Sequence, residues 1–260
     1  MHPILIDFGV FALPSYGVMI AIAVLVGLWT LRRRAERGGL DAVRAVDLAV
    51  WVVIWALVGA KLLLVLVEWR RYLADPSDLL GLVRAGGVFL GGFLGGLTAG
   101  AVLMKRYGLP VLPTIDAIVP SLALGHAIGR VGCLLAGCCW GARCDLPWAV
   151  TYTDPVAATN VGTPLGVPLH PFPVYSSLFN LALWGLLEWL YRRRPPAGRV
   201  FAAYLALYGL GRFALEFTRG DASRGFVLGG LLSTSQAIAL GMMAAAIAVV
   251  VWTRRHPTDP

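Results

Sequence analysis

The segment 125–141, which reads GHAIGRVGCLLAGCCWG, places ionisable and thiol side chains inside an otherwise apolar stretch. His126 and Arg130 are four residues apart, so that they share one face of a helix. A guanidinium group offers two parallel hydrogen bonds to a phosphate. The segment therefore indicates a site that binds an anion.

A second segment, 204–221, reads YLALYGLGRFALEFTRGD and carries a polar stripe. Tyr208, Arg212 and Glu216 follow one another at intervals of four, and Arg219 extends the stripe beyond them. A charge near the centre of a bilayer costs roughly 2.5–3.5 kcal/mol, so that such residues usually face a partner or a substrate. An Arg212–Glu216 pair that only fixes helix packing is one interpretation. We favour the other, in which Arg212 and Arg130 bind one phosphate.

The cysteines are spaced as Cys133-x4-Cys138-Cys139-x4-Cys144. This spacing matches no familiar zinc or iron–sulfur pattern, and no metal or other cofactor is expected. One or two disulfides are open alternatives at an oxidising membrane face, and so is a membrane thiol oxidoreductase. For Cys133 we favour an inert lining role.

The composition predicts an all-α integral membrane protein with about seven transmembrane helices. The chain has 260 residues, of which 58% are hydrophobic and only 14% are charged. No polar block is long enough for a soluble domain, so that residues 1–260 are expected to form a single membrane domain. A span needs ~20 helical residues, and the windows that provide them are 14–31, 46–67, 86–104, 115–135, 173–191, 200–217 and 231–252.

The basic residues predict the orientation of these spans. Thirteen of the 22 Lys and Arg residues fall in the loops of one side, which the positive-inside rule assigns to the cytoplasm. The N-terminus is then outside and the C-terminus cytoplasmic. The net charge of +8 reflects topology, so that no nucleic-acid partner is needed. The six basic residues of the outer side are Arg70, Arg71, Arg84, Arg143, Arg219 and Arg224.

Three further features concern the loops and the glycines. The first ten residues lack the basic cluster of a cleavable signal peptide, and none is expected. The long outer loop, about 138–172, is predicted to form a small external cap over the site. Glycines spaced by four within 86–96 predict close helix packing.

These motifs together resemble the prolipoprotein diacylglyceryl transferase family of bacteria, from about Tyr16 to about Trp252. GHAIGRVGCLLAGCCWG is similar to the family signature, in the form with Cys after GR-x-G. The supporting motifs, in chain order, are PSYGVMI, GAKLLLVL, GGVFLGGFLGG, LHPFPVYSS, YGLGRFALEFTRGD and LSTSQ. The resemblance implies transfer of a diacylglyceryl group from phosphatidylglycerol to the lipobox cysteine of a prolipoprotein signal peptide. A thioether forms and glycerol 1-phosphate leaves. The resemblance also implies a multi-pass protein of the bacterial cytoplasmic (inner) membrane.

The resemblance assigns activity or lipid binding to Tyr16, Arg130, Gly141, Tyr208, Arg212 and Glu216. In this interpretation Arg130 and Arg212 bind the headgroup, Tyr208 and Glu216 orient Arg212, and Tyr16 contacts the lipid. Lys61 and Arg219 are further expected contacts to the substrate.

Three positions depart from the family pattern. Leu90 stands where His or Tyr is common, Lys61 where Arg is common, and Ser176 where Glu is usual. Leu90 cannot act as a base, so that either His126, the better candidate, or His170 is expected to replace it, unless the thiolate is generated in another way. A packing role for His126 and a loop-fixing hydrogen bond for His170 are the alternative interpretations. The alternative is a catalytically altered or inactive paralogue that binds phospholipid or a lipoprotein signal peptide.

Overall fold

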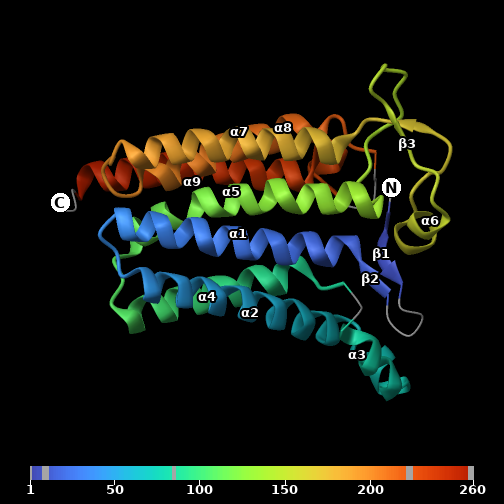
Figure 1. Ribbon diagram of the computed structural model, residues 1–260, viewed down its shortest axis with the longest axis horizontal. Helices are drawn as coiled ribbons and strands as arrows, with labels where there is room; N and C mark the ends of the chain where they lie inside the picture. Colours follow the sequence, from blue (N-terminus) through green and yellow to red (C-terminus); the bar gives the residue numbers. More distant parts are fainter. Residues whose placement is uncertain (1, 8–11, 84–85, 221–224, 257–260) are drawn as a thin grey trace. The chain divides into compact units, whose positions relative to one another are not determined.

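The structure, a computed structural model, describes residues 2–7, 12–83, 86–220 and 225–256 and is mainly α-helical (Figure 1). A long helix overlaps each of the seven predicted windows, with ends that differ from the windows by up to six residues. These helices are α1 (Ser15–Arg37), α2 (Ala42–Val67), α4 (Phe89–Tyr107), α5 (Val111–Ala136), α7 (Phe172–Arg192), α8 (Arg199–Glu216) and α9 (Thr234–Arg255). Within the described ranges, the four helices α1, α2, α5 and α9 are long and apolar enough to cross a membrane. Arg84 and Arg224, two of the basic residues counted above, lie outside the described residues.

Short elements connect these helices. They are α3 (Trp69–Ala74), α6 (Pro155–Val161) and the 3-10 helices η1 (Pro76–Val83) and η3 (Leu228–Gly230). The strands pair antiparallel, β1 (Ile4–Asp7) with β2 (Ala12–Pro14), β3 (Val150–Thr151) with β4 (Pro168–Leu169), and β5 (Phe226–Val227) with β6 (Leu232–Ser233). The loop predicted as a cap thus contains α6 and the small sheet of β3 and β4.

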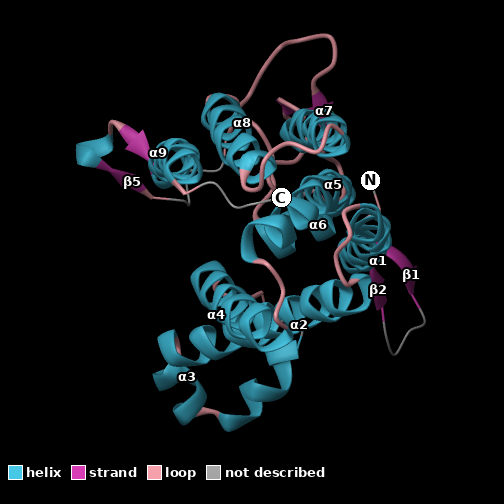
Figure 2. Ribbon diagram, turned by 90° about the vertical axis from the view of Figure 1, so that its left-hand side faces the viewer, coloured by secondary structure: helices cyan, strands magenta, loops and turns pink. Residues whose placement is uncertain are grey.

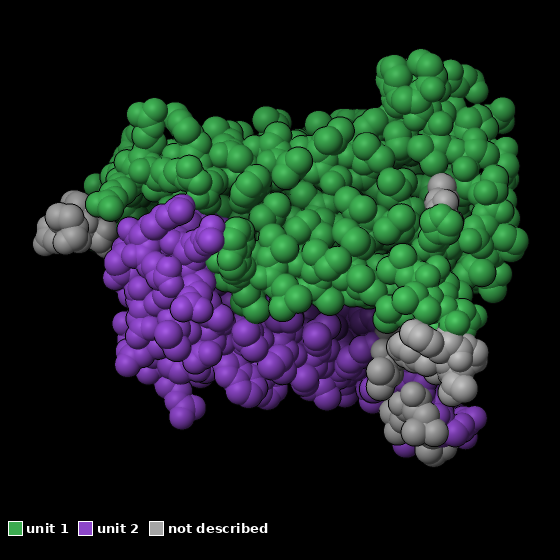
Figure 3. Space-filling model, viewed as in Figure 1, with its two compact units in different colours: residues 1–30, 115–260 green, residues 31–114 purple. Residues whose placement is uncertain are grey.

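The chain divides into two compact units, residues 1–30 with 115–260, and residues 31–114 (Figure 3). In the second unit α2 packs closely against α4 through glycines. A Cβ atom on Gly91 would lie 2.3 Å from the carbonyl oxygen of Gly59, and one on Gly95 would lie 2.4 Å from that of Trp55. Only glycine permits these approaches, which bears out the packing role predicted for the glycine run.

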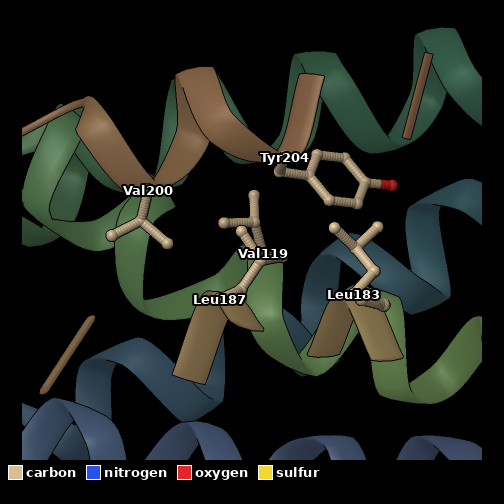
Figure 4. Packing of buried hydrophobic residues seen from close by; sticks show 6 residues of the cluster. Val119, Leu183, Leu187, Val200 and Tyr204 are labelled. Atoms are coloured by element: carbon tan, nitrogen blue, oxygen red, sulfur yellow. The ribbon is translucent and has the colours of Figure 1, made fainter. Parts of the chain in front are cut away.

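In the first unit α8 packs against both α7 and α9 (Figure 2). A buried cluster joins α8 to α5 and α7 (Figure 4). Its members include Val119 of α5, Leu183 and Leu187 of α7, and Val200 and Tyr204 of α8, each at most 5% exposed. This core fixes the spacing of the three helices that supply most of the candidate site.

Asp116 is a buried acidic residue of α5, and the start of α8 explains it. Its carboxylate accepts hydrogen bonds from the backbone N–H of Gly198 at 2.6 Å and of Phe201 at 2.7 Å. The first N–H groups of a helix lack partners within the helix and favour a negative charge. Asp116 therefore caps α8 from a neighbouring helix.

Candidate active site

Arg130 lies on α5, and a buried phenylalanine flanks its guanidinium group. The Cζ atom lies 5.6 Å from the ring centroid of Phe172, the first residue of α7. Among the described residues Arg130 has no ion pair and no hydrogen-bonded carboxylate. Since a guanidinium group keeps its charge, this arrangement leaves its donors available to an anion.

Arg212 of α8 approaches the same ring, with its Cζ atom 5.9 Å from the Phe172 centroid. Its Nη1 atom pairs with the Glu216 carboxylate at 2.5 Å, and its Nη2 atom donates to the Ser235 hydroxyl at 2.8 Å. The side chains of the pair are only 12% and 9% exposed. Arg212 is thus held on two sides.

Arg219 follows the end of α8 and lies nearest the ring, with its Cζ atom 4.5 Å from the Phe172 centroid. Because Arg130, Arg212 and Arg219 all surround one ring, no two of their Cζ atoms are more than about 12 Å apart. We call this group the arginine centre. Glu216 offsets the charge of Arg212, so that this group of residues retains an excess of positive charge that favours a bound anion.

Gly141 helps to hold Arg219 in place. The two residues form an antiparallel β-bridge, and the neighbouring Ala142 N–H donates to the Thr218 carbonyl at 2.9 Å. A Cβ atom on Gly141 would lie 2.5 Å from the His170 oxygen and 2.7 Å from the Thr218 oxygen. Three backbone segments, at Gly141, His170 and Thr218, therefore pack so closely that only glycine fits at position 141.

His126 and Tyr208 lie side by side, with ring centroids 5.5 Å apart, and Tyr208 also stacks on Tyr204 at 5.4 Å. Within the described ranges the buried Nδ1 atom of His126 has no hydrogen-bond partner. No hydrogen bond from Tyr208 to Arg212 is seen in the part of the chain described. Glu216 and Ser235 are the groups that hold Arg212.

Tyr16, near the start of α1, contacts the outer part of α5. A Cβ atom on Gly132 would lie 3.3 Å from the Tyr16 ring, and Tyr16 is close enough to Arg130 for an electrostatic interaction. The Tyr16 side chain is 44% exposed. It therefore borders the arginine centre while remaining accessible.

Three of the cysteines form a compact cluster. The sulfur atoms of Cys133, Cys138 and Cys139 all lie within 4.8 Å of one another. Hydrogen bonds from the Cys133 and Cys138 thiols hold the pKa of Cys139 well below its ordinary value, and the charges of Arg130 and Arg219 lower this pKa further. The cysteine cluster therefore adjoins the arginine centre.

Lys61 and Leu90 belong to the second unit. The Nζ atom of Lys61 donates to the carbonyl oxygens of Leu82 at 2.7 Å and Gly86 at 3.3 Å, so that it ties α2 to the chain before α4. Leu90 lies at the start of α4 with 56% of its surface exposed.

The sequence pattern of the prolipoprotein diacylglyceryl transferase family matches residues 3–252. The chain belongs to this family. It is 36% identical to the phosphatidylglycerol–prolipoprotein diacylglyceryl transferase of Clostridium tetani, over 92% of this chain and 93% of the relative. The enzyme of the same name from Synechococcus elongatus is 35% identical over 96% of this chain and 86% of its own length. That of Geobacillus kaustophilus is 34% identical over 92% and 87%.

In this member of the transferase family, two contacts of the arginine centre involve residues that the sequence had not singled out. Phe172 lies within HPFPVYSS and Ser235 within LSTSQ, two motifs that carried the resemblance. Neither side chain is ionisable, so that charge and spacing gave no reason to select these two residues. Their position within two motifs of the family pattern was the only indication in the sequence.

Proposed function

We propose that this chain transfers the diacylglyceryl group of phosphatidylglycerol to the lipobox cysteine thiol of prolipoproteins. A carbon–sulfur bond forms, the bond between the glycerol carbon and the phosphate oxygen breaks, and glycerol 1-phosphate leaves. Membership of the family supports this activity. The observation that carries the mechanism is the convergence of Arg130, Arg212 and Arg219 on Phe172.

The arginine centre suits the leaving group. As the carbon–oxygen bond breaks, negative charge grows on the phosphate, and fixed cations stabilise it most when water is excluded. Arg130 and Arg212 would bind the headgroup phosphate, with Glu216 and Ser235 orienting Arg212. Arg219 would add a third contact, and Tyr16 would meet the glycerol or the phosphate.

The thiol of the acceptor must lose its proton, because the thiolate is the nucleophile and a free thiol has a pKa near 8.5. We assign His126 as the base, with Tyr208 beside it. The support for this assignment is the buried Nδ1 atom without a partner and the position of His126 one helical turn before Arg130. The role of Gly141 is to position Arg219 against the substrate, and Lys61 is a further proposed contact to the lipid.

The proposed setting is the bacterial cytoplasmic (inner) membrane. All seven long helices would cross it, with the N-terminus outside and the C-terminus in the cytoplasm, as the distribution of basic residues favours. The segment 138–172 would cap the site from outside. Phosphatidylglycerol would enter from the bilayer, and the prolipoprotein signal peptide would present its cysteine at the outer surface.

Leu90 favours a second candidate function. It is an exposed apolar residue that cannot transfer a proton. A paralogue with altered or absent transfer activity would still bind phosphatidylglycerol or a lipoprotein signal peptide at the arginine centre.

A transfer assay separates the two functions. Membranes containing the protein, from cells depleted of their own transferase, would receive phosphatidylglycerol with labelled acyl chains and a lipobox peptide. We expect label on the peptide and none on a peptide with Ser in place of the lipobox Cys. The Arg130→Ala variant should lose activity about 10²–10³-fold, whereas Arg143→Ala, which removes an exposed loop arginine, should retain it. No label transfer by well-folded wild-type protein would favour the binding paralogue, and full activity of Arg130→Ala would refute the role of Arg130.

A further inference from the structure

The spacing of the three sulfur atoms suits one metal ion. In a tetrahedral zinc site the Zn–S bond is about 2.3 Å, which places the sulfurs about 3.8 Å apart. The sulfur atoms of Cys133, Cys138 and Cys139 already lie within 4.8 Å of one another. A contraction of at most about 1 Å would bring them to bonding distance of a common ion.

The backbone holds the cysteine cluster together. Cys133 is in the last turn of α5, which ends at Ala136. Gly137 then turns the chain with φ at 75°, and the Cys138 N–H donates a hydrogen bond to the Cys133 carbonyl oxygen at 3.0 Å. Cys139 is itself left-handed, with φ at 57°. This conformation is uncommon for a residue other than glycine, and it brings two neighbouring thiols to the same point.

The surroundings favour a negatively charged complex. Three thiolates and one Zn²⁺ carry a net charge of −1, and both Arg130 and Arg219 act electrostatically on Cys139. The hydroxyl group of Tyr152 is buried and has no hydrogen-bond partner among the described residues. The charges of all three cysteines act on Tyr152, so that this unused donor lies beside the cluster.

We propose that Cys133, Cys138 and Cys139 bind one zinc ion and that its fourth position takes the acceptor thiol. This inference rests on the transfer activity proposed above. Zinc sites with three protein ligands keep one position open for a reactant, and a thiol that coordinates zinc is deprotonated.

The lipobox thiol gives its proton to a base, for which His126 is assigned above, and its sulfur becomes the fourth zinc ligand. This sulfur then attacks the glycerol carbon of the lipid, and the electron pair of the breaking carbon–oxygen bond leaves with the phosphate. No electron is gained or lost by the metal. Because Arg130 and Arg219 act on Cys139 and also surround Phe172, the thiolate and the phosphate would meet within one site.

Metal content tests the three ligands. The full-length protein would be purified in detergent under reducing conditions, equilibrated with Zn²⁺, freed of excess ion and analysed for zinc. We expect one zinc per chain in the wild type and in Cys144→Ser, whose thiol lies outside the cluster. Each of Cys133→Ser, Cys138→Ser and Cys139→Ser should lower the content at least tenfold while keeping the melting temperature of the zinc-free wild type. No bound zinc, equal loss in Cys144→Ser, or a disulfide among the three cysteines of the untreated protein would overturn the proposal.

Cobalt tests the fourth position. Co²⁺ in place of zinc reports each sulfur ligand as charge-transfer absorption, and a lipobox peptide should increase that absorption, whereas its Ser analogue should not. An identical response to both peptides would refute the assignment of the fourth position. The transfer assay distinguishes this failure from failure of the proposed function. Full transfer by zinc-free protein would overturn the metal step and leave the activity standing, whereas no transfer by zinc-loaded protein would defeat the activity itself.

Discussion

Asp116 and Arg130 lie on the same helix, α5, about 21 Å apart along its axis. The two charged side chains differ in their hydrogen-bond partners. The Asp116 carboxylate accepts two backbone N–H groups from the start of α8. Arg130 lies beside the Phe172 ring and near Tyr16 and Cys139, with no carboxylate partner in the ranges that the structure describes. Backbone N–H groups compensate the buried charge of Asp116, and we propose that a lipid phosphate compensates the charge of the half-buried Arg130.

Arg212 has features of both Asp116 and Arg130. It is paired with Glu216 and bonded to Ser235, yet its guanidinium group still reaches the ring that Arg130 approaches. An ion pair therefore does not by itself make an arginine structural. We propose that Arg212 also contacts the substrate, from the side that faces Phe172.

The largest effect is expected for Arg212→Ala, because it removes a phosphate contact and leaves the Glu216 carboxylate buried without its partner. Breaking a buried pair in this way costs about 3–5 kcal/mol of stability, and transfer should fall below detection. Thermal unfolding in detergent and the labelled transfer assay measure the two effects. The double variant Arg212→Ala/Glu216→Ala should regain most of the stability and none of the activity. Recovery of activity in the double variant would show that Arg212 only balances Glu216.

The Asp116→Ala variant should lose stability and keep its chemistry. A hydrogen bond to a charged group contributes about 1.5–3 kcal/mol, and the variant should unfold at a lower temperature to match. Asp116→Asn, which retains one acceptor oxygen, should lose less. The rate of transfer per folded molecule should equal that of the wild type. A specific loss of activity without loss of stability would contradict the structural role given to Asp116.

Gly141→Ala tests how the arginine centre is held. A Cβ atom there would lie 2.5 Å from a backbone oxygen, so that the loop must shift at a cost of about 1–3 kcal/mol. The shift would displace Arg219, and we expect lower stability together with weaker transfer. Gly185→Ala is the matched control, because a Cβ atom on Gly185 has no heavy atom within 4 Å. Equal behaviour of the two variants would exclude a packing constraint at Gly141.

The smallest effect is expected for Ser235→Ala, which removes one neutral partner of Arg212 and leaves Glu216 in place. A hydrogen bond of this kind is worth about 1 kcal/mol, equivalent to roughly a fivefold change in kcat/KM. Steady-state kinetics with the lipobox peptide measures it. An effect as large as that of Arg212→Ala would mean that Ser235 contacts the substrate directly.

The helices were predictable because long apolar windows leave the backbone no other way to satisfy its hydrogen bonds in a bilayer. The proposed meeting of Arg130 and Arg212 followed from the same reasoning, since two isolated arginines in separate spans each need an explanation. The cysteine cluster was not predictable from its spacing. It depends on the left-handed turn at Gly137 and Cys139, which no periodicity reports. The hydrogen-bond partners of Asp116 could not be predicted either, because they are backbone N–H groups, which every residue except proline carries.

The affinity for phosphatidylglycerol tests the central claim most directly. Purified wild type, Arg130→Gln and Asp116→Asn would each be titrated with a short-chain phosphatidylglycerol, with the matching diacylglycerol, which lacks the phosphate, as the control lipid. The account predicts that Arg130→Gln weakens binding at least tenfold, or about 1.4 kcal/mol, whereas Asp116→Asn binds like the wild type. Unchanged affinity in Arg130→Gln would contradict it.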